Sequence, residues 1–466
     1  LETFFRHATE LEFFLHVPRF RHAVTLPVDS PGRPCQGLIS TVLLLGLNLT
    51  EKYIPNSRSS CNNDPLNILN DISLTDATIV SQEAIYLSRA QIDVAGIIST
   101  THPDRIVHGI QAELLLSTYL FRQGRILEGK YHLSAATSIA FSAKFHKIRS
   151  LNADRDMLVS AGLPWVTLLP PSVDPISEGE RINAFWTILA SSNCWALAAD
   201  SSPNFLLERY IEDIDTPWPM DIEDYDRNLL PEYLGSATVI KLLQGTPIPG
   251  DTVGRGVSTL ALYVQASILL SRAATVALAY HPNMSSPAAA KFTTNFLELD
   301  GVIDRFKTTL MNSSNSSPNN RNKTMLFTTH LIAHLATIVL HSKVATMAPS
   351  NPTLDSFPME ASNSGHKRLD AADAIVQLSR QWRTSVNPNP NPFLGSLWLA
   401  VGQVLIEEIN LVRFLNNGKD SDGSVRETEL RDMLDCIFES AQLPRVYYSP
   451  LAGKCVPFYS PFNIQV

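Results

Sequence analysis

The sequence of 466 residues is poor in charge. Charged residues make up 18% of it, below the usual quarter of a globular chain, and 37 basic against 45 acidic residues leave a net charge of −8. No run of five basic residues occurs, so the chain itself lacks the Lys/Arg density that neutralises nucleic-acid phosphates. This absence argues against direct nucleic-acid binding by these residues.

The sequence is also poor in cysteine. No two of its five cysteines form a Cys-x-x-Cys pair, which excludes a zinc ribbon and a thioredoxin-like motif. The cysteines are few, odd in number and widely spaced, which favours a reducing compartment over a disulfide framework. The cysteines are Cys35, Cys61, Cys194, Cys436 and Cys455.

The short motifs of common enzyme classes are missing. There is no Gly-x-Ser-x-Gly, P-loop or Gly-x-Gly-x-x-Gly sequence. His330 and His334 stand four residues apart, with His341 further along, but Leu331 occupies the place where zinc proteases need Glu. We interpret these histidines as helix-packing side chains. We predict a chain that is not an enzyme and has no catalytic, cofactor-binding or metal-binding residues.

Residues 418–429 (GKDSDGSVRETE) nearly match a calcium-binding EF-hand loop. Asp420, Asp422, Gly423 and Glu429 fall at loop positions 3, 5, 6 and 12, but Gly418 replaces the first carboxylate ligand. We interpret the segment as a hydrophilic loop leading into a helix at 426–442, and leave calcium binding open.

The densest acid cluster lies at residues 210–226 (YIEDIDTPWPMDIEDYD). Its seven carboxylates are Glu212, Asp213, Asp215, Asp221, Glu223, Asp224 and Asp226. Pro217 and Pro219 disfavour helix around Trp218, so the acids fall into two groups on either side of an extended segment. They cannot share one helix face to hold Mg²⁺. We predict that Trp218 packs into the core while the acids face water or cap neighbouring helices.

Helical periodicity dominates the rest of the chain, and strand signals are sparse. Ile106, Ile110 and Leu114 recur at four-residue intervals, and a helix rich in small residues follows after Gln123-Gly124-Arg125, which predicts an antiparallel hairpin. We predict an all-α fold, a large multi-helix array of packed antiparallel helices with long polar loops. Helices are expected at 1–16, 102–122, 127–146, 178–200, 256–280, 287–311, 323–347, 366–386, 393–416 and 426–442, with polar breaks at 313–322, 349–365, 387–392 and 416–424.

Two parts are expected. Residues 1–75 form an N-terminal mixed segment packed on the array or leading into it, and residues 76–466 form the helical domain. The most apolar segment, 257–280, carries Arg272 and several Ser, Thr and Gln residues, so we interpret it as a buried helix and expect no membrane partner.

Three stretches together resemble a known family. They are HPDRIVHGIQAELLLSTYLFRQGRILEGKYHLSAATSIAFSAKFHKI, EGERINAFWTILASSNCWALAADSSPNF and IDTPWP. The combination is similar to the middle regulatory region of fungal zinc-cluster transcription factors, the fungal-specific or xylanolytic-activator type regulatory domain. The likeness covers about residues 80–345. Its most specific pieces are Gly129-Lys130-Tyr131, the helix from Arg181 to Trp186, and Ser202-Pro203-Asn204-Phe205 leading to Asp213–Pro219.

The resemblance implies a nuclear protein that regulates transcription of target genes by RNA polymerase II. DNA binding would reside in an N-terminal zinc cluster of six cysteines, which is missing from this chain, so zinc is expected only upstream. Because the chain starts at Leu1 rather than Met, we expect such an upstream segment. Implied partners are coregulator proteins, a small-molecule effector and a second copy in a homodimer. Ser191-Ser192-Asn193 departs from the family, whose members often carry a charged pair there.

Two other classes stay open at this point. A helical-repeat adaptor that binds proteins, without a DNA-binding module, would share the composition and the helices. A metal-dependent all-α enzyme is less favoured because no motif of that chemistry is complete.

Overall fold

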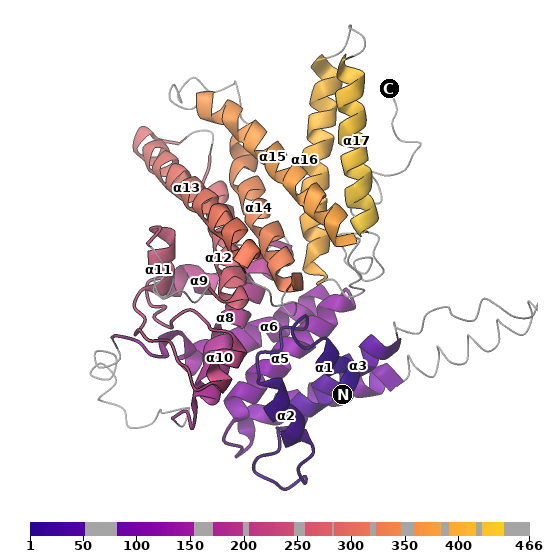
Figure 1. The fold of residues 1–466 in the computed structure, drawn as a ribbon, viewed down its shortest axis with the longest axis vertical. Coiled ribbons are helices and arrows are strands. Elements are labelled where there is room, and N and C mark those ends of the chain that lie inside the picture. Colours follow the sequence, from indigo (N-terminus) through magenta and orange to yellow (C-terminus); the bar gives the residue numbers. More distant parts are fainter. Residues whose placement is uncertain are drawn as a thin grey trace, which may run out of the picture.

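The segments with helical periodicity in the sequence form helices along most of the described chain (Figure 1). The computed structural model describes residues 1–51, 82–152, 171–198, 205–246, 257–281, 284–316, 323–345, 358–383, 391–415 and 422–441. Within these ranges there is no strand, only an isolated bridge between Ser150 and Gly235. The all-α array is therefore confirmed. The expected boundary at 75/76 lies outside the described residues.

The helices of the first half are α1 (Glu2–Arg6), α2 (Val17–Val24), α3 (Gln36–Glu51), a helix at 82–96, η1 (Ile97–Ser99), α5 (Arg105–Arg122), α6 (Ile126–Ser142), η2 (Phe145–Lys147), α8 (Pro175–Ala198), α9 (Phe205–Tyr210), α10 (Ile222–Asp226) and α11 (Thr238–Leu243). Those of the second half are α12 (Thr259–Leu278), α13 (Ser286–Ser316), α14 (Lys323–Ala345), α15 (Pro358–Arg383), α16 (Phe393–Leu415) and α17 (Asp422–Ala441).

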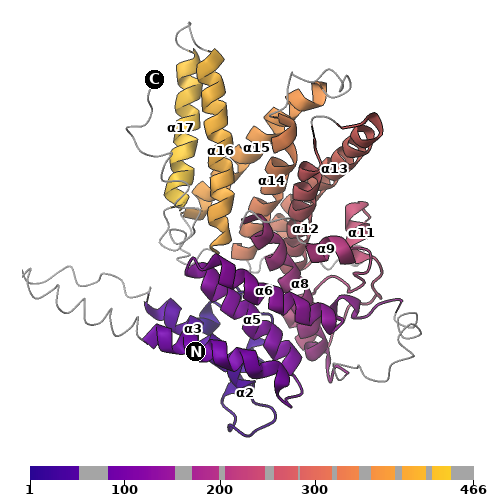
Figure 2. The ribbon, with the colours of Figure 1, turned by 180° about the vertical axis from the view of Figure 1, so that it is seen from behind.

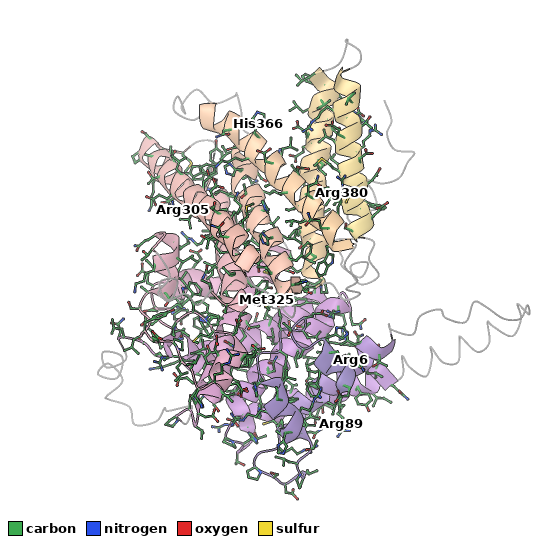
Figure 3. The ribbon with its side chains drawn as sticks, in the orientation of Figure 1. Arg6, Arg89, Arg305, Met325, His366 and Arg380 are labelled. Carbon is green, nitrogen blue, oxygen red and sulfur yellow. The ribbon has the colours of Figure 1, made fainter. Side chains whose placement is uncertain are left out.

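Two central helices join the lower and upper parts of the molecule (Figures 1 and 2). Helices α1 to α6 form the lower part, and α13 to α17 stand above it as a fan. Between them α8 packs on α12, and α8 also contacts α5, α6 and α16. Figure 3 places Met325, near the N-terminus of α14, where the fan meets the lower part. A single hydrophobic cluster runs through both parts.

Helix α8 is central because most of its surface is apolar. Pro175 stands at its first position, where a missing N–H costs nothing, and Phe185, Trp186 and Leu189 are fully buried. A helix that is apolar on most sides has to be surrounded by other elements. Buried helices of this kind account for the low share of charged residues in the sequence.

The predicted hairpin is formed by α5 and α6, which pack on each other. Gly124 has a φ of 72°, a left-handed conformation that glycine adopts without steric cost, and it reverses the chain between the two helices. The small residues Ala136 and Ala140 are buried on α6, so its neighbours can approach closely. The hairpin prediction is confirmed.

Several predicted boundaries are wrong. The helix expected at 1–16 ends at Arg6, and Glu12 has a φ of 59°. Helix α13 continues to Ser316 into an expected break, and α15 starts at Pro358, within the expected loop at 349–365. Polar composition favours loops there, but α15 as a whole packs on α14, and most helical stability in proteins comes from packing of this kind.

Candidate functional site

The prolines of the 210–226 stretch form a joint that packs on α8. The Nε1 group of Trp186 donates a hydrogen bond to the carbonyl oxygen of Pro217 at 2.7 Å. Trp186 also stacks on Trp218, with ring centroids 4.6 Å apart. Trp218 is only 6% exposed, so the prediction that it packs into the core is confirmed.

Asp215 does not face water, the first of the two settings predicted for the acids, but it contacts the start of a neighbouring helix, α11, as the second setting expects. It is 1% exposed and accepts hydrogen bonds from Ser150 Oγ at 2.6 Å and from the Ala237 backbone N–H at 2.8 Å. Lys147 Nζ lies 3.2 Å away. Burial alone would raise the pKa of Asp215, but these donors and the lysine charge together lower it. The carboxylate therefore stays ionised and joins three separate segments, around residues 147–150, 215 and 237.

The chain around Asp215 is held by backbone contacts as well. The backbone N–H groups of Asp215 and Thr216 both donate to the carbonyl oxygen of His146, at 2.9 and 3.1 Å. Thr216 Oγ1 donates to the carbonyl oxygen of Phe145 at 2.6 Å. We call this unit, residues 145–150 with 214–219 and 235–238, the Asp215 joint.

Four of the acids, from Asp221 to Asp226, lie on the far side of the prolines from Asp215, as predicted. Residues 214–221 are not helical, and the short helix α10 then carries Glu223 and Asp224. Burial, together with those two negative neighbours, raises the pKa of Asp221 to about 6. All seven carboxylates belong to the described chain, and no three of them converge closely enough to hold one ion.

His341 links three helices of the fan. Its Nδ1 lies 2.9 Å from Ser364 Oγ and its Nε2 lies 3.0 Å from Asp300 Oδ1. A Ser–His–Asp chain invites comparison with a hydrolase triad. However, Ser364 is 1% exposed, and Lys367 Nζ lies 2.6 Å from an Asp300 oxygen. This series of hydrogen bonds therefore ties α13, α14 and α15 together.

The other two histidines of α14 are partly buried. Burial lowers the pKa of His330, and burial with the nearby Lys307 charge lowers that of His334 to about 4. Both rings are therefore neutral near pH 7. Their interpretation as helix-packing side chains agrees with this environment.

The described part of the near-match, residues 422–429, does not have the form of a calcium loop. Helix α17 begins at Asp422, so Asp422, Gly423 and Glu429 lie on a helix, whereas an EF-hand wraps these positions around the ion. Glu429 pairs with Arg426 at 3.0 Å. The helix thus starts four residues earlier than the predicted residue 426, while Gly418 and Asp420 lie outside the described residues.

A buried carboxyl group from the N-terminal segment reaches the centre of the array. Glu12 accepts hydrogen bonds from Ser191 Oγ on α8 at 2.5 Å and from Tyr263 OH on α12 at 3.4 Å. Burial raises the pKa of Glu12, against the effect of those two hydrogen bonds and of the Arg122 charge. In the sequence, Ser191 stands out only as a departure from the family pattern, and no sequence signal marks Glu12.

Glu180 offers a test of how the N-terminal segment is held. Its Oε1 accepts the His16 backbone N–H at 2.9 Å. Burial, assisted by Asp104 and Asp174, raises the pKa of Glu180 to about 7. A carboxyl group whose pKa is raised on folding stabilises the folded state while it is protonated. This contribution is fully present below the unfolded-state pKa of about 4.5, and it is lost as the pH rises from there through 7.

We expect Glu180→Gln, which keeps the acceptor oxygen but not the charge, to be more stable than the natural chain at pH 8. The gain should be on the order of 1 kcal/mol after solvent screening, and it should vanish near pH 4.5. Thermal unfolding at both pH values measures it. Glu298→Gln, an exposed carboxylate on α13, serves as control and should show no such difference. An equal gain at both pH values would contradict the charge argument.

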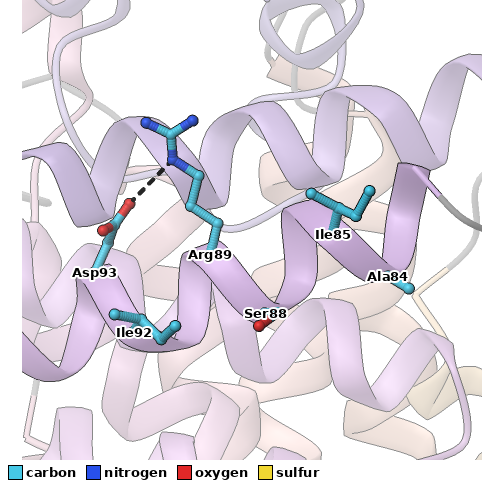
Figure 4. Close-up of a pocket in the computed structure, with 6 residues that line it drawn as sticks. All are labelled: Ala84, Ile85, Ser88, Arg89, Ile92 and Asp93. Atoms are coloured by element: carbon cyan, nitrogen blue, oxygen red, sulfur yellow. Dashed lines mark ion pairs between the residues drawn. The ribbon is translucent and has the colours of Figure 1, made fainter.

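An open hollow of about 450 Å³ lies along the outer face of the helix at 82–96 (Figure 4). Ile85 and Ile92 are 66% and 71% exposed there, and Arg89 pairs with Asp93 at 3.7 Å. All six lining residues belong to this one helix, so the hollow lacks convergent groups from a second element. The other lining residues are Ala84 and Ser88.

Three helices, α12, α14 and α16, are long and apolar enough to cross a membrane by length and composition. In this fold 83% of the apolar window of α12 is buried, which agrees with its interpretation as a buried helix. The windows of α14 and α16 are 61% and 44% buried. The absence of a membrane partner stays a prediction.

Only one group of three metal-ligand side chains converges within the described residues. It comprises Cys35, His102 and His108; the cysteine precedes the two histidines by more than 60 residues, and the three match no spacing motif. Comparison of the chain with protein-family models, with curated proteins and with solved structures gave no match. The resemblance to the fungal regulatory region therefore rests on the sequence stretches alone.

Proposed function

We propose that this chain is the regulatory region of a fungal zinc-cluster transcription factor. It would modulate transcription of target genes by RNA polymerase II in the nucleus, without enzymatic activity. DNA would be bound by a zinc cluster outside these 466 residues. Coregulators, a small-molecule effector or a second copy would act on the helical array.

One observation supports the proposal most. The sequence stretches that carry the resemblance meet in one buried unit: Phe141 of α6 contacts Phe185 of α8 edge to face at 5.7 Å, and Trp186 stacks on Trp218. These contacts join residues 44 and 32 positions apart in the sequence. The three stretches therefore belong to one folding unit, as a single regulatory domain would require.

Regulation also needs a part that changes when a partner or effector binds. The Glu12 centre joins the N-terminal segment to α8 and α12 through a buried carboxyl group. We propose that a partner or effector acts by altering this contact between the N-terminal segment and the central helices.

A reporter experiment tests the proposal. The chain is placed between a heterologous DNA-binding domain and an activation domain in a fungal host. We expect reporter output at least about fivefold lower than in the fusion without the chain, the low end of ordinary allosteric coupling. Gly235→Ala, which breaks the Asp215 joint, should restore output, and Asp213→Asn should not. Equal output from all four fusions, at matched protein levels, would contradict regulation.

The sequence of the complete transcript distinguishes the transcription factor from the protein-binding adaptor. Six closely spaced cysteines followed by a basic linker, encoded in the same reading frame, would favour the transcription factor. A complete transcript without them would favour a protein-binding adaptor.

A further inference from the structure

We propose that Cys35, His102 and His108 form a zinc-binding site. Their ligand atoms all lie within 4.8 Å of one another, and the two imidazole centroids are 5.0 Å apart. The residues come from three segments: Cys35 immediately precedes α3, His102 lies in the turn before α5, and His108 lies in the first turn of α5. Tetrahedral zinc holds neighbouring ligand atoms somewhat closer, at roughly 3.3–3.8 Å, so small side-chain rotations close the site.

An unsatisfied polar atom marks this place in the fold. Nε2 of His102 is shielded from solvent and has no hydrogen-bond partner. Buried polar atoms without partners are rare and each needs an explanation, such as a ligand. Cys35 is 7% exposed, so a metal held here would be screened from bulk water on the thiolate side.

The existing hydrogen bonds can be exchanged for metal bonds. The Cys35 backbone N–H donates to His108 Nδ1 at 3.4 Å, near the limit for a hydrogen bond. The Asp104 backbone N–H donates to His102 Nδ1 at 3.0 Å in an exposed position. For Nε2 of His102 to bind zinc, its proton must move to Nδ1, and water then accepts the Asp104 N–H. The Cys35 thiol loses its proton to solvent, so one proton leaves per zinc bound.

The donor set favours zinc over hard cations. One thiolate and two imidazoles suit zinc, which commonly takes three protein ligands and a water as the fourth. Calcium and magnesium prefer oxygen ligands and are disfavoured here. Bound zinc would tie the start of α3 to α5 and thereby fix the N-terminal segment on the hairpin. This inference concerns a site inside the chain, separate from any zinc cluster outside it.

Cobalt titration of the chelator-treated full chain tests the proposal. We expect one Co²⁺ per chain with a thiolate-to-cobalt charge-transfer band, displaced by Zn²⁺, and a rise in unfolding temperature with Zn²⁺. Cys35→Ser should abolish the band, whereas Cys436→Ser, a buried cysteine on α17, should keep it. His102→Asn should weaken Zn²⁺ binding at least about tenfold while the helix content stays unchanged.

The contrary outcomes are distinct. No band in the natural chain, or a band that survives Cys35→Ser, would overturn the site. Binding of Cu⁺ without binding of Zn²⁺ would overturn the metal assignment. If Cys35→Ser fails to fold, His102→Asn decides, because unchanged Zn²⁺ affinity in that variant contradicts the proposal.

Discussion

The Gly235→Ala variant is expected to lose most of its folded population. A Cβ atom at this position would lie 1.5 Å from the carbonyl oxygen of Asp215 and 2.7 Å from its carbonyl carbon. Neither atom can rotate away, because both belong to the backbone. Gly235 itself is fixed, since its N–H donates to Arg149 and its carbonyl oxygen accepts from Leu151, each at 2.9 Å.

We therefore expect a destabilisation above about 3 kcal/mol, beyond the usual cost of overpacking. Denaturant unfolding followed by circular dichroism measures it. Gly96→Ala is the matched control, because nothing lies within 4 Å of a Cβ there, and it should change stability by less than about 0.5 kcal/mol. If the free energy of unfolding of Gly235→Ala lies within about 1 kcal/mol of the natural chain's, Gly235 does not pack against the Asp215 backbone as described.

Asp215→Ala should destabilise the fold by about 3–5 kcal/mol, the usual result of removing one partner from a buried ion pair. The change leaves Ser150 Oγ and the Ala237 N–H without their acceptor and removes one of the two carboxylates beside Lys147. Asp213→Ala is the control: that side chain is 60% exposed and lies 3.6 Å from the same lysine, so we expect at most about 1 kcal/mol.

The pH dependence of the same pair checks the mechanism. The pKa of Asp215 is lowered in the folded chain, so its contribution is present above the unfolded value of about 3.8 and is lost as the pH falls through the folded one. The difference between the natural chain and Asp215→Ala should therefore shrink below about pH 4. If the difference in unfolding free energy between the two chains stays constant down to about pH 2.5, roughly a unit below the unfolded pKa, Asp215 is not ionised in the folded chain.

Local pattern was enough to place most helices, because each apolar face repeats within a few residues. The hairpin of α5 and α6 follows from the spacing of Ile106, Ile110 and Leu114 and from the turn at Gly124. The first turns of α15 were missed because their composition is polar. A hydrogen bond between Ser364 and His341, which lies 23 residues away, helps to hold that segment against α14.

The site residues were harder to predict for a different reason. Composition places a carboxylate in water unless its partners are known, and the partners of Asp215 lie more than 60 residues upstream and 22 residues downstream. The same holds for Cys35 and His108, which are 73 residues apart. Burial of Trp218 could be predicted because an aromatic side chain between two prolines needs no distant partner to favour the core.

Glu12 has a consequence for the order in which the chain folds during synthesis. Its partners Ser191 and Tyr263 follow it by 179 and 251 residues. At about 5–20 residues per second, the ribosome exposes the second partner on the order of 10–50 s after Glu12 has been made. Until then the N-terminal segment has a carboxyl group with no place to be buried. A chaperone that binds this segment early would keep it available until α12 emerges.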